Sequence, residues 1–490
     1  MASRYGIMHC YAIVIWTLLF EMCLAENVLV SVSDPMTSSA ERRYILYDVN
    51  HGEGFNLRRD VFMRVANTVR LLRERGYNYV LVLPPWGGLY HWKNAGTKLP
   101  WSLFFDVSSI NQLVPVVEFE QYLKDTNNDD IDEVIYLQGY AEGWSNGHYE
   151  IKYDKRECID GNKRGWFFSY SDVRALAFSC VSIQGDSNTL ADLIERNHSS
   201  TSSIFIDRAE TILHSRFGDS RYWQARRAMR YAKHLVKIGN QFRSEKFGSN
   251  DLSDRTVLDN DWESTVKKHG DALGGDFICA HWRRRDFVRS HAADIPSIEG
   301  TARIITKILK EERLNKVFLS TDAHPEEVAE LRKWTPPDVT IEQFLDHGSL
   351  SDGEISIIDQ WICAHARYFT GTHVSTFSYR IQEDREILGF RPETTFNRLC
   401  PDEDANCEQP AKWKIVYEDS EIIFQWICAH ARYFTGTHVS TFSYRIQEDR
   451  EILGFRPETT FNRLCPDEDA NCEQPAKWKI VYEDSEMYDL

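Results

Sequence analysis

Short apolar runs that alternate with amphipathic helical segments constrain the fold of this chain more than any other feature. The first run, RYILYDV at residues 43–49, has the β-branched and aromatic composition of a strand. After the loop NHGEGFN, apolar residues recur at helical spacing, at Leu57, Val61, Val65, Thr68 and Leu72. A second strand-like run, YVLVL at residues 79–83, ends at two prolines. This order predicts a βαβ unit with parallel strands.

A second series of the same kind begins at FICAHW, residues 277–282, after a polar stretch from Ser244 to Asp276. It continues with the strand-like runs KVFLSTD and VTIE and with the helix-like segments PEEVAELRKW and IIDQWICAHA. Further strand candidates of the first series lie at residues 114–117 and 134–137. Two such series on either side of a polar joint predict an α/β protein with two Rossmann-like domains that face each other.

An identical block of 62 residues occurs twice, at Gln360–Glu421 and Gln425–Glu486. Solenoid repeats diverge while they keep a pattern, and at least three are needed to bury a continuous core, so two identical copies do not predict a solenoid. They indicate a recent exon duplication or an error of gene assembly. Removing one copy and its three-residue spacer would shorten the chain from 490 to 425 residues.

The first 25 residues have the pattern of a secretory signal peptide. An apolar run from Tyr11 to Phe20 follows a start that contains Arg4, and the small residue Ala25 closes the segment. This run has about half of the roughly 20 apolar residues that cross a bilayer. We therefore expect cleavage after Ala25, with a type II membrane anchor as the alternative, and we expect no membrane span in the rest of the chain.

Entry into the secretory pathway permits disulfides and N-glycosylation, and one sequon begins at Asn197. Signal cleavage would remove Cys10 and Cys23 and leave nine cysteines, three of them in the second copy of the block. The expected disulfides are Cys158–Cys180 and Cys400–Cys407, because each closes a short polar loop. Two further cysteines lie in apolar runs and are expected to be buried free thiols, namely Cys279 and Cys363.

The charge balance speaks against a nucleic-acid partner. The chain has 57 basic and 74 acidic residues, a formal net charge of −17, which repels polyanions. The most basic segment, Arg221–Arg243, has the periodicity of one long amphipathic helix, and its basic face is expected to be solvated.

The first candidate site is the segment HGEGFNLRRD, residues 51–60, where a strand meets a helix. Glycines on both sides of Glu53 let the backbone approach a ligand closely, and the start of the helix offers unpaired N–H groups to a phosphate. Ligands of α/β proteins bind beyond the carboxyl ends of strands, where this loop lies. A tight turn with Glu53 as an exposed or helix-capping carboxylate is the alternative.

The second candidate site is HWRRRD, residues 281–286, at the end of the run FICA. Side chains alternate along a strand, so Arg283 and Arg285 would share one face and could grip a pyrophosphate. An arginine–aspartate salt-bridge network is the alternative.

The third candidate site combines Asp359 with the segment GTHVSTFS, residues 371–378. A carboxylate can accept hydrogen bonds from the N1 and N2 donors of guanine, and Ser375 and Thr376 at the start of a helix present hydroxyl and N–H groups to a phosphate. The alternative is a simple N-cap of a buried helix.

A metal site is not expected. The acidic triplet Asp130-Ile131-Asp132 lies in the polar run NNDDIDE and is expected to be a solvated loop. The sequence contains no HExxH motif, no cysteine–histidine spacing typical of zinc, and no GxSxG motif.

Five segments, EGFNLRRD, LPPWGGLYHW, FLDHGSLSDG, IIDQWICAHARYF and STFSYRI, together resemble the GDP-fucose protein O-fucosyltransferase 2 family. The resemblance runs from about residue 40 to the end of the first copy of the block. It implies a GT-B-like fold with the active site in the cleft between two Rossmann-like domains. It also implies an enzyme of the endoplasmic reticulum lumen that needs no metal and inverts the anomeric centre.

The resemblance also assigns roles to individual residues. The catalytic base of the family corresponds to Glu53, its phosphate-binding arginine to Arg283, and its guanine-reading aspartate to Asp359. The remaining donor-site positions are Gly52, Gly54, Phe55, Asn56, His281, Asp286, Ser375, Thr376 and Phe377. Trp86 of the PPWGG segment is expected to line the groove for the acceptor.

The implied donor is GDP-fucose, and the implied acceptors are Ser or Thr hydroxyls of folded thrombospondin type 1 repeats. An enzyme for EGF-like repeats and a non-catalytic module that binds cysteine-rich domains are the alternatives. The expected domains are residues 26–245 on the acceptor side and 246–421 on the donor side, followed by the second copy and tail at 422–490. The first copy is expected to complete the donor site, because Asp359 precedes Gln360 whereas Phe424 precedes Gln425.

Overall fold

The computed structural model describes residues 42–50, 53–89, 92, 96–126, 130–140, 150–159, 167–262, 266–346, 348–373, 375–411, 432–436, 446–447, 450, 455–465 and 472–475. The chain forms two units. Unit 1 consists of Met1–Glu53, Arg64–Ile212 and Ala228–Ala232, and unit 2 consists of Gly54–Met63, Leu213–Arg227 and Lys233–Leu490. The expected signal peptide and Gly52 lie outside the described residues. The expected domain boundary at residue 245 falls inside helix α7 (Lys233–Phe247).

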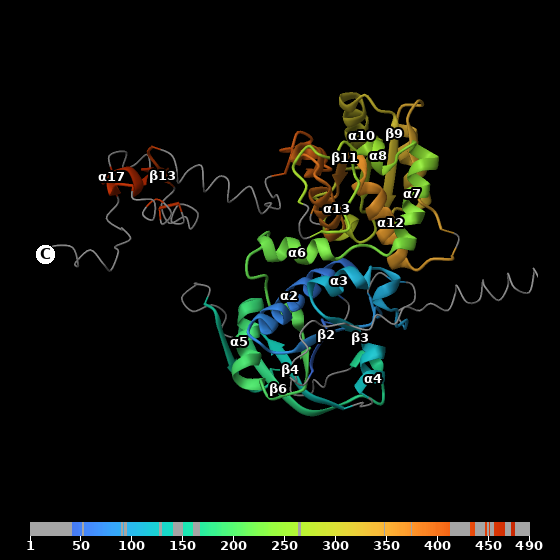
Figure 1. Cartoon of the computed structure of the whole chain (residues 1–490). Helices are drawn as coiled ribbons and strands as arrows, with labels where there is room; N and C mark the ends of the chain where they lie inside the picture. Colours follow the sequence, from blue (N-terminus) through green and yellow to red (C-terminus); the bar gives the residue numbers. More distant parts are fainter. Residues whose placement is uncertain are drawn as a thin grey trace, which may run out of the picture. The chain divides into compact units, whose positions relative to one another are not determined.

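Unit 1 is built on a seven-stranded sheet in the order β3-β2-β1-β7-β4-β6-β5. Figure 1 labels β2, β3, β4 and β6 of this sheet. Its strands pair in parallel, except that β5 is antiparallel to β6. The strands are β1 (Arg43–Tyr47), β2 (Tyr79–Leu83), β3 (Val116–Glu118), β4 (Asp130–Gln138), β5 (Lys152–Lys155), β6 (Arg174–Gln184) and β7 (Ser203–Asp207). The run YVLVL is buried at every position, as expected for a central parallel strand.

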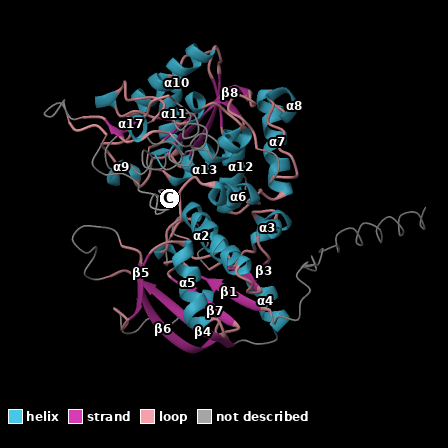
Figure 2. Ribbon diagram, turned by 60° about the vertical axis from the view of Figure 1, so that its left-hand side comes forward, coloured by secondary structure: helices cyan, strands magenta, loops and turns pink. Residues whose placement is uncertain are grey.

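Helices cover this sheet through their apolar faces. They are α2 (Phe55–Glu74), α3 (Val107–Leu113), α4 (Phe119–Thr126) and α5 (Ser187–His198), with short 3₁₀ turns at Trp101–Leu103, Phe167–Ser169 and Ala209–Thr211. Helix α2 packs against α5, where the Ser187 hydroxyl donates to the Arg64 carbonyl at 2.9 Å (Figure 2). Helix α5 begins at a capping box formed by Asp186 and Thr189.

Unit 2 contains a five-stranded, fully parallel sheet in the order β10-β9-β8-β11-β12. Its strands are β8 (Gly275–Trp282), β9 (Lys316–Thr321), β10 (Thr340–Glu342), β11 (Ala366–Gly371) and β12 (Asn397–Arg398). Two mainly parallel sheets with helical crossovers confirm the predicted α/β class, which the GT-B-like fold shares. Strands β11 and β12 belong to the first copy of the duplicated block, so this copy forms part of the sheet.

The helices of unit 2 surround that sheet, and α12 and α13 carry some of its functional candidates. They are α6 (Ser220–Ala228), α7, α8 (Asp251–Asp254), α9 (Phe287–Ser290), α10 (Ile298–Glu312), α11 (Pro325–Trp334), α12 (Asp352–Ala364), α13 (Thr376–Leu388) and α14 (Pro392–Thr395), with a 3₁₀ turn at Asp402–Asp404. Helix α12 begins at a capping box in which Ser351 and Glu354 exchange hydrogen bonds.

The single helix expected over Arg221–Arg243 is wrong, because the chain is helical in α6 and α7 but not between them. There the backbone turns to unit 1, where the Arg230 carbonyl accepts from the Asp106 N–H at 2.9 Å and the Ala232 N–H donates to the Phe104 carbonyl at 3.0 Å. The expected solvated basic face is also wrong in α6, since Arg226 and Arg227 are buried.

The acidic triplet at Asp130–Asp132 is not a loop, because it opens strand β4. The Asp132 carboxylate accepts hydrogen bonds from the Ser202 and Ser203 N–H groups at 3.1 and 2.8 Å. Asp130 forms an ion pair with Arg174 at 3.0 Å. These carboxylates therefore fasten the start of β4 to its neighbours. In the described part of the chain, no helix is long and apolar enough to cross a membrane.

The described residues of the second copy repeat the local structure of the first. Strands β13 (Thr435–Gly436) and β14 (Asn462–Arg463) pair as β11 and β12 do, and α17 (Pro457–Thr460) matches α14. Among the described residues, however, β13 and β14 form a sheet of their own, whereas β11 also pairs with β8.

Candidate functional site

The carboxyl ends of three parallel strands gather candidate residues at one edge of the sheet in unit 2. His281 lies near the end of β8, Ser320 near the end of β9, and Thr372 directly after β11. Strand register pairs His281 with both Ser320 and Gly371, so these side chains come from neighbouring positions. This edge is where α/β sheets bind their ligands.

Arg283 is held as a fixed fork by two carboxylates. Its Nη1 donates to Asp322 and its Nη2 donates to Asp286 at 2.6 Å. The Arg283 N–H also donates to the Thr372 hydroxyl at 2.9 Å, which fixes the backbone after β8. A guanidinium has five N–H donors, so a doubly paired Arg283 still has donors for a phosphate. The salt-bridge network that was one of two expectations is therefore present, and it includes the expected contact between Asp286 and Arg283.

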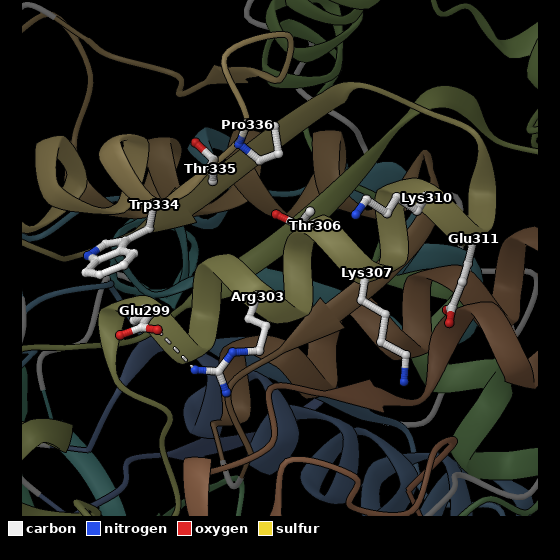
Figure 3. Close-up of a pocket in the computed structure, with 9 residues that line it drawn as sticks. All are labelled: Glu299, Arg303, Thr306, Lys307, Lys310, Glu311, Trp334, Thr335 and Pro336. Atoms are coloured by element: carbon white, nitrogen blue, oxygen red, sulfur yellow. Dashed lines mark hydrogen bonds and ion pairs between the residues drawn. The ribbon is translucent and has the colours of Figure 1, made fainter.

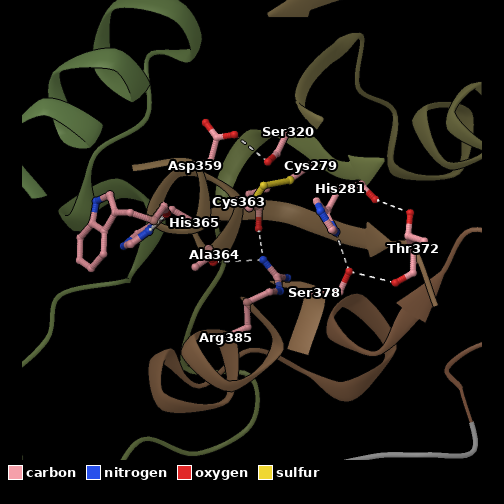
Figure 4. Close-up of a disulfide and its surroundings, with 12 residues drawn as sticks. Cys279, His281, Ser320, Asp359, Cys363, Ala364, His365, Thr372, Ser378 and Arg385 are labelled. Carbon is pink, nitrogen blue, oxygen red and sulfur yellow. Dashed lines mark hydrogen bonds between the residues drawn. A yellow bond between two sulfur atoms is a disulfide. The ribbon is translucent and has the colours of Figure 1, made fainter. Parts of the chain in front are cut away.

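Asp359 is half-buried in α12, and one of its oxygens has a partner (Figure 4). The Ser320 hydroxyl donates to Asp359 Oδ2 at 2.7 Å. Among the described residues, Oδ1 has no hydrogen-bond partner. Burial raises the pKa of Asp359 to about 7, and the Ser320 hydrogen bond opposes that rise. The carboxyl group is thus oriented by one oxygen while the other can still accept hydrogen bonds.

His281 is buried and neutral, and it supports the start of α13. Its Nδ1 lies 2.8 Å from the Ser378 hydroxyl, which itself donates to the Thr372 carbonyl at 3.1 Å. Because that hydroxyl proton goes to Thr372, the His281 Nδ1–H must be the donor to Ser378. The ring stacks on Phe377 with centroids 4.4 Å apart. Burial, followed by the positive charge of Arg283, lowers the pKa of His281 to about 3.

Helix α13 begins where the sequence predicted a phosphate-binding segment. Ser375 is the N-cap residue, but its side chain makes no capping hydrogen bond. Ser375 is buried, Thr376 is exposed and Phe377 is half-buried. The first N–H groups of a helix have no partner within the helix, so this end suits an anion.

The start of α2 belongs to unit 2 and contacts α12 through three polar side chains. The Gln360 amide accepts from Arg59 Nη1 at 2.7 Å and donates to Asn56 Oδ1 at 2.9 Å. Both Gln360 and Arg59 are buried, and Gln360 directly follows Asp359. Phe55 is buried at the first position of α2, and a methyl group added at Gly54 would meet no described atom within 4 Å. The segment Gly54–Asn56 and Asp359 thus belong to the same unit.

Glu53 is the last residue of unit 1 and is half-buried. Its N–H donates to the Asn50 carbonyl at 3.2 Å, which closes the turn between β1 and α2. A tight turn at this point, one of the expectations from the sequence, is therefore present. The role of Glu53 as a base stays a prediction.

The disulfides expected from the sequence, Cys158–Cys180 and Cys400–Cys407, are both present. The expectation of free thiols at Cys279 and Cys363 is wrong, because these residues form a third disulfide. Both cysteines are fully buried, as expected, but β8 and α12 bring their Cα atoms to 5.1 Å (Figure 4). The second copy repeats the local pair as Cys465–Cys472.

Two further candidates lie in unit 1. Trp86 is only 2% exposed and packs on Trp101 with ring centroids 4.8 Å apart. An acceptor would therefore meet the loop that Trp86 anchors, and a direct role for this side chain stays a prediction. Asn197 is exposed in the last turn of α5, where a glycan would not disturb the core.

A pocket of about 710 Å³ lies elsewhere in unit 2, between α10 and α11 (Figure 3). It is lined by Glu299, Arg303, Thr306, Lys307, Lys310, Glu311, Trp334, Thr335 and Pro336. None of the candidate residues from the sequence lines this pocket, so it is separate from the site at the ends of β8, β9 and β11.

Sequence reasoning missed three residues that fix the candidates. Asp322 follows β9 and holds Arg283, Ser320 orients Asp359, and Gln360 ties α12 to α2. The position of Asp322 gave a usable signal, because polar residues after neighbouring parallel strands converge at one edge of a sheet. Ser320 lies inside a strand and Gln360 inside a helix, so neither offered such a signal.

The sequence of this chain is similar to those of known proteins. A family model described as GDP-fucose protein O-fucosyltransferase matches residues 44–388. GDP-fucose protein O-fucosyltransferase 2 of Caenorhabditis elegans is 50% identical over 428 residues, which cover 84% of this chain and 100% of that protein. The protein of the same name from Homo sapiens is 47% identical over 401 residues, 79% of this chain and 93% of that protein.

Solved structures are more distant. The crystal structure of POFUT1 in complex with GDP-fucose matches with a TM-score of 0.49 and 15% identity, over 73% of this chain and 97% of that one. The curated relatives, together with the family model, identify a glycosyltransferase that acts on proteins. The chain belongs to the GDP-fucose protein O-fucosyltransferase family.

Proposed function

We propose that this chain transfers fucose from GDP-fucose, with inversion and without a metal, to Ser or Thr hydroxyls of folded thrombospondin type 1 repeats. Asp359 reads the guanine, Arg283 stabilises the departing diphosphate, and Glu53 is the general base. The enzyme works in the lumen of the endoplasmic reticulum. The observation that carries the proposal is the Asp359 carboxyl group, whose buried Oδ1 has no hydrogen-bond partner among the described residues.

A buried oxygen of this kind fits a ligand that supplies hydrogen-bond donors. Leaving a buried polar group unsatisfied costs about 1–3 kcal/mol, so a partner from the ligand would be strongly favoured. Guanine offers N1–H and N2–H donors side by side, whereas the Watson–Crick edges of uracil and cytosine offer a different pattern. The carboxylate therefore favours GDP over other nucleotide carriers.

Negative charge grows on the β-phosphate as fucose leaves. Arg283 is held by Asp322 and Asp286, so its guanidinium is already oriented and need not reorganise when that charge develops. The first N–H groups of α13 and the Ser375 and Thr376 hydroxyls supply further donors to the same diphosphate. These groups take the place that a divalent cation occupies in other transferases.

The acceptor hydroxyl is a poor nucleophile until its proton is removed. Glu53 directly precedes the segment Gly54–Asn56, which belongs to the same unit as Asp359, and its carboxylate is suited to accept that proton. Inversion needs one such carboxylate, because a single displacement forms no glycosyl-enzyme intermediate.

The acceptor class rests on the family resemblance of the sequence motifs, and a direct assay tests it. GDP release would be measured with a folded thrombospondin repeat, with the same repeat after reduction, and with a folded EGF-like repeat. We expect turnover with the folded thrombospondin repeat and little with the other two. Equal rates on the reduced repeat, or a preference for the EGF-like repeat, would contradict the proposal.

The chemistry is tested with Glu53→Ala and with chelation. The variant should bind GDP normally while transfer falls by about 10² to 10⁴, the usual contribution of a general base. Wild-type transfer should persist in EDTA. Near-normal turnover of the variant, or activity that EDTA abolishes and manganese restores, would refute the corresponding part of the proposal.

A further inference from the structure

The two copies of the duplicated block compete for one place in the sheet of unit 2. The match extends upstream of the block, since Ile357-Ile358 and Ile422-Ile423 also correspond. From Ile357 onward the copies differ at a single position, where Asp359 in the first copy corresponds to Phe424 in the second. The second copy could therefore supply every contact that the first makes from Gln360 onward, but it would replace the guanine-reading carboxyl group with a phenyl ring.

Loop closure and helix capping favour the first copy. Nine residues connect β10 to α12, and the second copy would lengthen this connection by 65 residues, a disadvantage of about twentyfold in loop closure. The Ser351–Glu354 capping box increases the preference for the first copy by about another fivefold. The second copy has Val416 and Asp419 at the corresponding positions.

Burial of a charge favours the second copy. The environment raises the pKa of Asp359 from 3.8 to about 7, so the ionised form is disfavoured by roughly a thousandfold relative to water. A phenylalanine carries no such penalty. The two factors that favour the first copy multiply to about a hundredfold. The charge factor is about a thousandfold in the opposite direction, so equilibrium packing by itself does not secure the functional copy.

The Cys279–Cys363 disulfide distinguishes the copies covalently. Cys279 lies on β8, outside the block, and Cys363 lies on α12, four residues after Asp359 (Figure 4). The residue of the second copy that corresponds to Cys363 is Cys428. Cys279 can bond to only one of them. The local disulfides Cys400–Cys407 and Cys465–Cys472 form within each copy and do not decide between the two.

We propose that the Cys279–Cys363 disulfide is a register lock that commits the first copy to the sheet and so keeps Asp359, rather than Phe424, in the donor site. The role of Asp359 in this statement rests on the proposed function. The first copy leaves the ribosome about 3 to 13 s before the second, because synthesis adds about 5–20 residues per second. Disulfides form within seconds or longer, so the first copy has the earlier opportunity to be locked. Once formed, the bond is buried and shielded from thiols.

Disulfide mapping of the full chain tests the lock. Free thiols are alkylated under denaturing, non-reducing conditions, and the protein is digested with trypsin. The peptide with Cys279, residues 269–283, should be linked to residues 334–367, which contain Cys363, and Cys428 should be alkylated. A link to residues 415–432, which contain Cys428, would overturn the proposal.

Cysteine variants then test the consequence for the donor site. In Cys363→Ser, Cys279 should bond to Cys428, and the affinity for GDP should fall at least tenfold. In the double variant Cys363→Ser/Cys428→Ser neither copy can be locked, so the first copy can again occupy the sheet in part of the molecules. The affinity should then recover to a value between those of Cys363→Ser and wild type. Cys428→Ser is the matched control and should leave both the map and the affinity unchanged.

If the disulfide has only a structural role, the double variant should bind GDP no better than Cys363→Ser. If Cys363→Ser merely weakened the fold, removing Cys428 as well would not rescue GDP binding, and failure of that rescue would overturn the lock. If Cys279 bonds to Cys428 in Cys363→Ser but the GDP affinity is unchanged, the lock is upheld and the guanine-reading role of Asp359 is refuted. If Cys363→Ser is not secreted, the map of the wild-type chain decides the question.

Discussion

Asp359 is half-buried, and its buried Oδ1 keeps its capacity to accept hydrogen bonds. Its hydrogen bond from Ser320 orients the group, and Gln360, the next residue, ties the same helix to the start of α2. Nucleotide binding and helix packing are therefore coupled through adjacent side chains.

GDP affinity should depend on pH through Asp359. Burial raises the pKa of this group to about 7, and only the ionised form accepts hydrogen bonds at both oxygens. The affinity should therefore fall about tenfold between pH 8 and pH 6, measured by titration calorimetry. Asp359→Asn is the control and should retain only the pH dependence of the diphosphate. A wild-type profile that matches this variant would contradict the prediction.

The same pKa predicts a trend in stability without ligand. The folded chain holds the Asp359 proton up to about pH 7, whereas an unfolded chain releases it near its ordinary value of 3.8. Because the folded state binds more protons in this window, this group lowers the free energy of unfolding as the pH rises from about 4 to 7. Urea unfolding should show Asp359→Asn as more stable than wild type at pH 8 and not at pH 4. A gain in stability that is equal at both pH values would argue against burial of the charge.

Arg283→Lys should impair transfer as severely as Arg283→Ala. The guanidinium uses two terminal nitrogens to hold Asp322 and Asp286 while it donates to the diphosphate, and a single ammonium cannot reproduce this fork. We expect kcat to fall by about 10² or more in both variants. Arg289→Lys, an exposed change in the neighbouring helix α9, is the control. Activity of Arg283→Lys near wild type would mean that charge alone suffices.

At the scale of elements, α6 and α13 are joined by buried ion pairs that the sequence pattern did not reveal. Arg226 bonds to Glu383 at 2.6 Å, and Arg380 bonds to the same carboxylate at 2.9 Å. The Tyr222 hydroxyl donates to Glu383 at 2.7 Å. Helix α13 also carries the Ser375–Phe377 segment at its start, so this network fixes the helix that offers N–H groups to the diphosphate.

Glu383→Gln should destabilise unit 2 by about 3–5 kcal/mol, because it leaves two buried guanidinium groups without their shared charge partner. Urea unfolding with an unchanged slope against denaturant would measure the loss. Glu393→Gln, at an exposed position after α13, should change the stability by less than about 0.5 kcal/mol. A loss below about 1 kcal/mol for Glu383→Gln would show that the network relaxes easily.

At the scale of the whole molecule, the second copy has the sequence that fits the five-stranded sheet of unit 2, but the first copy already occupies that position. Its described strands β13 and β14 pair with each other, while the first copy provides β11 and β12 to the five-stranded sheet. The apolar residues that face β8 in the first copy have identical counterparts in the second. Such segments favour exchange between chains and aggregation.

The 425-residue chain that lacks one copy should therefore be secreted better than the full chain, with equal or higher specific activity. Deleting Gln360–Phe424 and deleting Ile422–Glu486 produce the same 425-residue sequence, in which Asp359 precedes the single remaining copy. Secretion, size-exclusion profile and transfer rate would be compared with those of the full chain. A full-length protein that is monomeric, more stable and more active would contradict this prediction.

Much of the fold followed from local patterns. The β-branched runs at residues 43–49, 79–83 and 277–282 all contain strands, and the helix after the EGFN loop is present. Hydrophobic periodicity and turn residues depend on residues close together in the chain, so a single sequence is enough to recognise them. The disulfides Cys158–Cys180 and Cys400–Cys407 were predictable for the same reason, since their partners are 22 and 7 residues apart.

Some residues of the candidate site could be recognised in the sequence, and others could not. The motifs around Arg283, Asp359 and Ser375 stand out in the sequence because chemically capable residues lie at the ends of predicted strands and helices. Ser320 and Gln360 did not stand out, because each lies inside an element and contacts a group 39 residues or more away. Asp322 was overlooked although its position directly after β9 offered a signal.

The sequence by itself determined the α/β class, the local disulfides and the family motifs, because these depend on residues close together in the chain. Only the tertiary structure decided that Cys279 pairs with Cys363 across 84 residues and that Arg226 is buried against Glu383. Parallel strands are connected through long crossovers, so the neighbours of β8 come from distant segments. Their identity depends on how those segments pack, which no local pattern records.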